Sequence, residues 1–349
     1  MTAMGGIGDK PEIEVLCNLT LAPSVLTSAA DASWIVGLDQ TDKPRFRAVR
    51  LKKATTVEPF PTENAALGDK SAEIVLDAIE ALQTDHDGLI WALDNGRRTE
   101  IPPKIVAWDD EDQKVTLVRN LAPPATVPGS FLADFIVDPD SPLVVITDPA
   151  NGNDAALILL DRNTGIARRI LEGHASVMPD KATPLPLPRG VTLPKRLDGS
   201  PALPRNGVRP LALDRKAEWL YFAAVQSRTL YRLPMRLLRK GNTSADAIVS
   251  ALESYAQKPP CCSMVIDFKN NIHLGDLQNH AIGVIEGGNR SYRTIASDAR
   301  LLWPDGLCFG QDGKLYFFSR LLAPNPKRTD AIQHPIFCIQ PLAEGRAGD

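Results

Sequence analysis

Acidic and amide side chains stand at the beginning of several apolar stretches that are spread over the whole chain. Asp77, Asp134 and Asp305 are carboxylates of this kind, and Asn206 contributes an amide. Carboxylate and amide oxygens that meet at one place can bind Ca²⁺ or a similar oxygen-seeking cation. The same carboxyl groups can transfer protons if burial raises the pKa of one of them. Which chemistry applies depends on whether the fold brings these distant residues together.

A second candidate is the stretch QTDHDGLIWALDNG at residues 83–96, in which Asp85, His86 and Asp87 are adjacent. Three such residues could serve as metal ligands or as an acid/base pair. The tetrad DHDG nevertheless has counterparts elsewhere in the chain, each between two apolar runs. These counterparts are DPDS, DRKA, FKNN and QDGK. Because Asp, Asn and Gly supply tight-turn geometry, we predict a turn between two strands here, with a metal site as the alternative.

The turns belong to a repeat in which an apolar strand, a short turn and a second apolar strand follow one another. Several units continue into third and fourth strand-like segments. The repeat units beside residues 83–96 are 22–38, 132–148, 206–225, 263–277 and 305–321. Six such units predict an all-β fold, a six-bladed β-propeller with four-stranded blades, as a single domain over residues 1–349. We expect the strand-like ends 12–19 and 335–342 to pair within one blade and close the ring.

Three segments interrupt the repeat. Residues 243–257 have helical spacing behind a Thr243 or Ser244 N-cap and predict a helix between blades. Residues 71–85 fit either a helix or a strand, and the repeat favours an inner strand over about 77–82. Residues 173–205 are rich in proline and lack periodicity, so we expect a long loop that crosses the mouth of the central channel.

In a propeller the inner strands line a central channel and all run in the same direction, so their first residues converge on one mouth. We expect a ligand site there, with a turn-capping or core role as the structural alternative for each residue. Glu80 points into the channel if 77–82 is a strand, and Trp303 is placed to form the floor of the pocket. The other expected site residues are Asp77, Asp134, Asn206, Cys262, Ser263 and Asp305, with Ser24 as a weaker counterpart in the first blade.

Composition and charge narrow the class of partner. The net charge is −3 with a pI near 6.0 and no basic run, which argues against nucleic acid and against an anionic membrane surface. No apolar stretch is long enough to span a membrane and no signal peptide begins the chain, so we expect a cytoplasmic protein, or a secreted one if a signal was removed. Glycosylation at Asn18, Asn242 or Asn289 matters only in the second case. We expect the five cysteines to be reduced and the closed ring to be a monomer.

Several of these segments together resemble the signature blocks of the Yellow/major royal jelly protein family. They are, in order, GLIWALDNG, LADFIVDP, ALILLDRNTGIARRIL, LYFAAVQSRTLYRLPMRLL, IHLGDLQNHAIGVIE and LLWPDGLCFGQDGKLYFFSRLL, within residues 70–325. The resemblance implies a six-bladed propeller with a small-molecule pocket in its channel, similar in fold to gluconolactonase-like propellers. Propellers of that kind that hydrolyse lactones hold a divalent metal with a Glu, Asn and Asp set. Asn206 and Asp305 match such positions, whereas Cys262 and Ser263 replace an Asp-Gly and no clear Glu begins the first blade.

Three functions follow from these observations. The first is an enzyme that isomerises, tautomerises or cyclises a cyclic or aromatic natural-product intermediate. It would use Asp305 or Asp134 with a raised pKa for proton transfer, Asn206 to orient an oxygen and Trp303 to pack against a ring. The second is a metal-dependent lactonase, and the third is a binder of small aromatic molecules without turnover. We favour the first, with a small organic ligand and no required cofactor; Ca²⁺ or another divalent cation at the mouth is the alternative.

Overall fold

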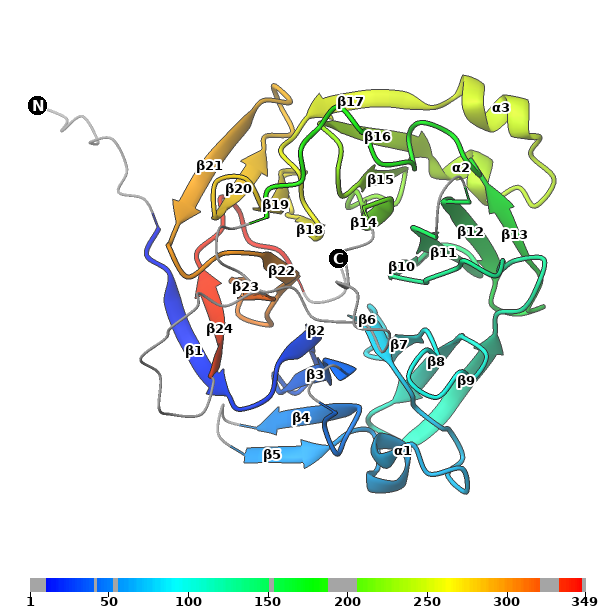
Figure 1. Cartoon of the computed structure of the whole chain (residues 1–349), viewed down its shortest axis with the longest axis vertical. Coiled ribbons are helices and arrows are strands. Elements are labelled where there is room, and N and C mark those ends of the chain that lie inside the picture. Colours follow the sequence, from blue (N-terminus) through cyan, green and yellow to red (C-terminus); the bar gives the residue numbers. More distant parts are fainter. Residues whose placement is uncertain are drawn as a thin grey trace, which may run out of the picture.

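The computed structural model describes residues 11–40, 43–52, 56–150, 154–187, 206–320 and 333–346. Six four-stranded antiparallel sheets are arranged as blades around a central axis (Figure 1). This confirms the predicted six-bladed propeller. In each blade the first strand lies nearest the axis and the fourth strand lies at the rim (Figure 1).

Blades one to three each consist of four consecutive strands. Blade one contains β2 (Pro23–Ser28), β3 (Trp34–Leu38), β4 (Ala48–Lys52) and β5 (Thr56–Pro59). Blade two contains β6 (Ile79–Thr84), β7 (Ile90–Asp94), β8 (Lys104–Asp109) and β9 (Lys114–Asn120). Blade three contains β10 (Asp134–Val137), β11 (Leu143–Asp148), β12 (Ala156–Asp161) and β13 (Ala167–Ile170). The repeat units at 22–38, 83–96 and 132–148 therefore lie in separate blades, as predicted.

Blades four and five repeat the pattern, and blade six joins the two ends of the chain. Blade four contains β14 (Val208–Leu213), β15 (Trp219–Ala224), β16 (Thr229–Pro234) and β17 (Glu253–Gln257). Blade five contains β18 (Met264–Ile266), β19 (Ile272–Asp276), β20 (Ala281–Ile285) and β21 (Tyr292–Ser297). Blade six contains β22 (Pro304–Phe309), β23 (Leu315–Ser319), β24 (His334–Ile339) and β1 (Glu14–Leu19). β1 pairs antiparallel with β24, so the predicted closure of the ring by the two ends is confirmed.

The hydrophobic core lies between neighbouring blades rather than inside any one of them. One cluster combines side chains of blades two and three, such as Leu93 and Ile146, and another combines Val145 of blade three with Phe222 of blade four. Further clusters join blade four to five, five to six, six to one and one to two. Each blade is therefore held by packing on both of its faces, which fixes the inner strands relative to one another.

Each first hairpin of a blade is organised by one aspartate whose carboxylate accepts backbone N–H groups of the turn. Asp85 accepts from Asp87 and Leu89 at 3.0 and 2.9 Å, and from the indole N–H of Trp91 at 2.6 Å. The aspartates with this role in the six blades are Asp31, Asp85, Asp138, Asp214, Asp267 and Asp312. The predicted turn at residues 85–88 is thus confirmed, and the Asp85 carboxylate is occupied by it.

Two predictions for the interruptions require correction. The helix expected over 243–257 is short: α3 (Ala245–Ser250) begins behind Ser244, whose hydroxyl accepts from Ala247 N–H at 3.3 Å. The remainder, β17, pairs with β16 as the fourth strand of blade four, because the blade lacks an outer strand without it. Two helices were not predicted, α1 (Glu63–Leu67) and α2 (Met235–Leu238).

The ambiguous segment 71–85 contains the inner strand β6, which begins two residues later than predicted. Of the proline-rich segment 173–205, the part after Leu187 lies outside the described residues, and so does its predicted course over the mouth. All five cysteines are free thiols, as expected. Within the described ranges, no helix combines the length and apolar character that a membrane span requires.

We predict that Asp85→Ala lowers the free energy of unfolding by about 2 kcal/mol, because two backbone N–H groups and the Trp91 indole lose their acceptor. Chemical denaturation monitored by tryptophan fluorescence measures this change. The matched control is Asp112→Ala, in the turn between β8 and β9, whose side chain is 58% exposed. Equal stability of the two variants would show that the Asp85 turn contributes nothing.

Candidate functional site

The beginnings of the six inner strands surround one cavity on the axis of the ring. Every blade contributes a polar side chain near the first residue of its inner strand. These side chains are Ser24, Glu80, Asp134, Arg209, Ser263 and Asp305. The cavity holds about 100 Å³, which is less than the roughly 300–1,000 Å³ of typical ligand pockets. It therefore has room for the reacting part of a small molecule, while the rest of that molecule would lie in the mouth.

β-Bulges at the start of the inner strands help to direct these side chains. The pairing of β2 with β3 shifts between Pro23 and Val25, and that of β6 with β7 shifts between Ile79 and Ala81. Similar shifts occur in β14 after Val208 and in β22 after Asp305. A bulge adds one residue to one strand and turns its side chain away from the regular alternation. Ser24 and Glu80 are the extra residues in the first two cases, and both line the cavity.

Asp305 forms the electrostatic centre of the site. Its carboxylate accepts a hydrogen bond from Arg320 Nε at 2.8 Å and lies 3.4 Å from Arg209 Nη2. Arg320 in turn donates from Nη2 to the backbone carbonyl of Ser24 at 2.8 Å and from Nη1 to Asp39 at 3.4 Å. Blades six, four and one are therefore connected through this one carboxylate and its two guanidinium groups.

Asp305 is held in its ionised form. Burial alone would raise its pKa, but the guanidinium groups of Arg209 and Arg320, together with the hydrogen bond from Arg320, lower the pKa below its ordinary value. The sequence analysis expected a raised pKa for Asp305 or Asp134; the pKa is raised at Asp134 and lowered at Asp305. The pKa of Asp305 is lowered by Arg209 and Arg320, two arginines that the sequence analysis did not place beside it.

Glu80 and Asp134 line the same cavity, but their pKa values are raised rather than lowered. Burial raises the pKa of Glu80 to about 7, although the charges of Arg320 and Arg209 act against it. Burial also raises the pKa of Asp134 to about 7, against the charge of Arg209. One cavity therefore contains two carboxyl groups that change protonation near neutral pH and a third that stays charged.

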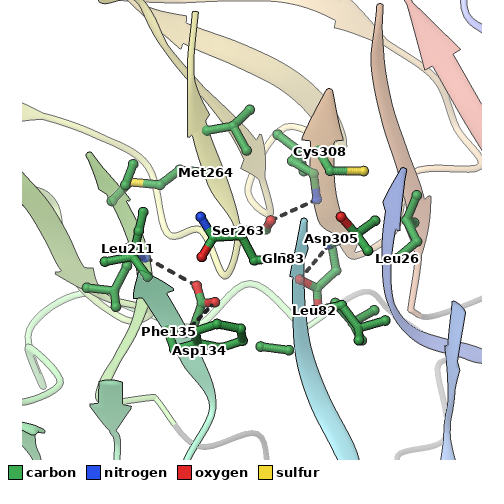
Figure 2. A pocket seen from close by; sticks show the side chains of 18 of the residues that line it. Leu26, Leu82, Gln83, Asp134, Phe135, Leu211, Ser263, Met264, Asp305 and Cys308 are labelled. Carbon is green, nitrogen blue, oxygen red and sulfur yellow. Dashed lines mark hydrogen bonds between the residues drawn. The ribbon is translucent and has the colours of Figure 1, made fainter. Parts of the chain in front are cut away.

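The surroundings of these two carboxyl groups differ. Asp134 accepts the backbone N–H groups of Phe135 at 2.9 Å and of Leu211 at 3.2 Å, as Figure 2 shows. Both hydrogen bonds favour its charged form. Glu80 is 9% exposed, and its carboxyl group has no hydrogen bond with any residue that the structure describes, so only burial and nearby charges act on its pKa. Glu80 is therefore the better proton donor of the two and Asp134 the better acceptor.

Two residues of blade five complete the wall of the cavity. Ser263 accepts the backbone N–H of Leu307 at 2.8 Å, which ties blade five to blade six (Figure 2). The Cys262 thiol contacts the carbonyl of Pro304 at 3.5 Å. Burial raises the pKa of the Cys262 thiol well above its ordinary value, so it is an uncharged wall group at neutral pH rather than a nucleophile.

Three of the expected site residues do not line this cavity. Asp77 precedes β6 and accepts the backbone N–H groups of Arg98 and Thr99 at 2.7 and 3.0 Å, so it organises a loop of blade two. Asn206 donates to Gln226 at 2.9 Å. Trp303 is 3% exposed and packs in a small cluster with Cys262, one shell behind the wall.

Sequence reasoning missed both arginines. Arg209 left a signal, since it interrupts the apolar strand VRPLAL at its second residue, as Asp305 does in β22 and Glu80 in β6. Placing the start of the fourth inner strand at Asn206 hid that match. Arg320 left no such signal, because it follows the second strand of blade six and reaches the mouth only through the three-dimensional arrangement.

A divalent cation does not fit beside Asp305 with the residues present. A cation bound there would lie next to two guanidinium groups that already use the same carboxylate oxygen. The other expected ligand, Asn206, does not line the cavity, and its amide Nδ2 donates to Gln226. Among the residues that the structure describes, no three or more His, Cys, Asp and Glu side chains are grouped in a way that could hold a metal ion.

The C-terminal segment lies at the far end of the channel. The carbonyl of Glu344 accepts the backbone N–H of Phe268 at 3.0 Å, and Gly345 lies against the ring of Phe309, the last residue of β22. Arg346 lines the cavity from this side. The C-terminal segment and the two arginines thus lie at opposite ends of the channel: Arg209 and Arg320 are at the mouth formed by the beginnings of the inner strands.

Comparisons with known proteins agree with this architecture. The family model described as "Major royal jelly protein" matches residues 79–323. A luciferin-regenerating enzyme superposes with a TM-score of 0.57 at 12% identity, over 97% of this chain and 98% of that one. XC5397 from Xanthomonas campestris, described as a gluconolactonase, gives 0.57 at 11% identity over 95% and 89%. Regucalcin from Agrobacterium tumefaciens, described as a calcium-binding protein, gives 0.55 at 13% identity over 95% and 96%. A search of curated protein sequences gives no match.

We predict that Glu80 and Asp134 make the protein less stable as the pH rises. Because their pKa values near 7 in the folded protein exceed those in the unfolded chain, their contribution is complete below about pH 4 and is lost as the pH passes through 7. The double variant Glu80→Gln/Asp134→Asn should remove roughly 5 kcal/mol of this decrease between pH 5 and 8, about half of it from each group. Denaturant titrations at each pH measure it, with Asp112→Asn as the control. Identical pH slopes for the double variant and the parent would contradict the assignment.

Proposed function

The chain belongs to the major royal jelly protein family, and from that premise we propose that it is an enzyme that moves protons on a small cyclic or aromatic molecule. The reaction would be an isomerisation, tautomerisation or cyclisation without hydrolysis. The observation that carries this proposal is the pair of carboxyl groups, the buried Glu80 and the half-buried Asp134, with pKa values of about 7 in one cavity. Groups with such values can give and take protons at neutral pH with the least penalty.

In the proposed step, Asp134 acts as the base and Glu80 as the acid. The Asp134 carboxylate removes a proton from the carbon next to a carbonyl group, and the electrons of that C–H bond form the new C=C bond. The electron pair of the carbonyl π bond accepts the proton of Glu80, which gives the enol. Return of a proton to another position completes an isomerisation, so neither an oxidant nor a reductant is consumed.

The ionised centre has a separate role in this proposal. Asp305 stays charged, is fixed by Arg320 and pairs with Arg209 beside the cavity, so the positive charge of Arg209 can stabilise negative charge that develops on the substrate. Asn206 and Trp303 lie outside the cavity wall and have no part in the step.

Lactone hydrolysis is the second candidate, favoured by the likeness in fold to a protein described as a gluconolactonase. In that case Asp134 would take a proton from the attacking water. Hydrolysis of gluconolactone, measured by acid release with and without added Ca²⁺, Mg²⁺ or Zn²⁺, tests it. Turnover of the lactone that exceeds proton exchange on ketones would favour this candidate over the first.

Proton exchange can be tested before the natural substrate is identified. We predict that the protein accelerates the incorporation of deuterium next to the carbonyl of phenylpyruvate or of 1-phenylpropan-2-one in D₂O, followed by NMR. Asp134→Asn and Glu80→Gln should each lower the rate by roughly 10²–10⁴-fold. The rate should fall on both sides of about pH 7, because the base is protonated below it and the acid is deprotonated above it.

Asp112→Asn, an exposed carboxylate of blade two, is the control and should keep the full rate. Thermal unfolding of each variant shows that it is folded. If Asp134→Asn and Glu80→Gln bind the probe and exchange its protons at the parent rate, these carboxyl groups do not transfer the proton. If the protein binds the probes tightly and exchanges none, it is a binder rather than an enzyme.

A further inference from the structure

The Arg209 side chain has hydrogen-bond donors that face the cavity. The side chain lines the cavity and is 18% exposed, and within the described part of the chain its one ion pair is that of the guanidinium group with Asp305, through Nη2 at 3.4 Å. A guanidinium group carries five N–H donors in a planar fork. Most of these donors are therefore available to a molecule that enters the cavity.

Arg320 differs from Arg209 in this respect. Each of its three guanidinium nitrogens has a protein acceptor, namely Asp305, Asp39 and the backbone carbonyl of Ser24. Arg320 thus fixes Asp305 in place and has its nitrogens engaged within the protein. Recognition of an incoming group is left to Arg209.

The backbone of Arg209 is held firmly, so its guanidinium has a defined position. The Arg209 carbonyl accepts the Thr147 hydroxyl at 3.2 Å, and the bulge between Val208 and Leu211 sets the direction of the side chain. Two residues further along the same strand, the backbone N–H of Leu211 donates to the Asp134 carboxylate at 3.2 Å. An acceptor bound to Arg209 would therefore be placed close to the proposed base.

The charges around Arg209 favour an anionic partner. Asp305 is shared with Arg320, and burial keeps Glu80 and Asp134 partly protonated near pH 7. A protonated carboxyl group can also donate a hydrogen bond to an anion. An ammonium group in the same place would instead lie against two guanidinium groups.

We infer that the molecule on which this cavity acts carries a carboxylate next to its reacting carbon, and that Arg209 binds this carboxylate through paired N–H···O hydrogen bonds. The inference rests on the proposed proton-transfer function and specifies its substrate class. A planar carboxylate matches a single guanidinium fork and fits the small cavity, with the remainder of the molecule in the mouth.

Binding of three related probes tests the inference by isothermal titration calorimetry. Phenylacetate, phenylacetamide and phenethylamine share a ring and differ in the charge of the terminal group. We expect phenylacetate to bind at least about tenfold more tightly than the amide, and the amine to bind most weakly. Arg209→Gln should weaken phenylacetate binding by roughly 10- to 100-fold and change the affinity for the amide by about twofold or less.

Two further variants make the result specific. Arg209→Lys keeps the charge and the contact with Asp305 but loses the fork, so it should bind phenylacetate with intermediate affinity. Arg236→Gln removes an exposed arginine on α2, also next to blade four, and should behave like the parent. Equal binding of phenylacetate and phenylacetamide, preference for the amine, absence of phenylacetate binding, or unchanged binding by Arg209→Gln would overturn the inference.

The same titrations separate this inference from the proposed function. Asp134→Asn and Glu80→Gln should still bind phenylacetate through Arg209 even though they exchange protons slowly. If Asp134→Asn and Glu80→Gln exchange protons at the parent rate while Arg209→Gln weakens phenylacetate binding, only the proposed proton transfer is contradicted. If those variants lose exchange but Arg209→Gln binds phenylacetate as the parent does, only the inference of a carboxylate-bearing substrate is contradicted.

Discussion

The ion pairs of Asp305 with Arg320 and Arg209 are the interaction on which the site depends. A carboxylate that is only 2% exposed would be costly to ionise alone, and two guanidinium groups would repel each other without it. Because Asp305 belongs to blade six, Arg209 to blade four and the Ser24 carbonyl bound by Arg320 to blade one, the charges also define how these blades meet at the mouth. The last blade is the one that closes the ring through β1, so the closure of the fold and the electrostatics of the site are linked.

Burial and charge act on three carboxyl groups in this one cavity, and their balance separates the three. The two arginines outweigh burial at Asp305, which engages both of them, whereas burial outweighs the same charges at Glu80 and Asp134. A site with one fixed charge and two groups that titrate near neutral pH can transfer a proton between two positions of a substrate while the charge of the wall stays constant. The architecture around it, with cores between blades, keeps these distances fixed.

The fold could be predicted from the sequence because each blade repeats a strand, an aspartate-centred turn and a second strand, and Asp85 is one of six such turn residues. The site could be predicted in part, since the beginnings of inner strands converge in any propeller, and Asp134, Ser263 and Asp305 do line the cavity. What the pattern could not provide was the effect of contacts distant in sequence. β17 was taken for helix because its helical spacing is a local signal and its pairing with β16 is not. The bulges that direct Glu80 and Arg209 arise from pairing between strands. Arg209 and Arg320 meet Asp305 only in the folded ring, and their charges lower the pKa that was expected to be raised.

The central claim is that Glu80 and Asp134 titrate near neutral pH beside an ionised Asp305. Infrared difference spectroscopy measures it directly, through the carbonyl stretch of protonated carboxylic acids recorded across pH 5 to 9. The account predicts a band that disappears with a midpoint near pH 7, that is halved in Asp134→Asn or Glu80→Gln and is absent from the double variant. A spectrum in which every buried carboxyl group is already ionised at pH 5, with no band that these substitutions remove, would contradict it.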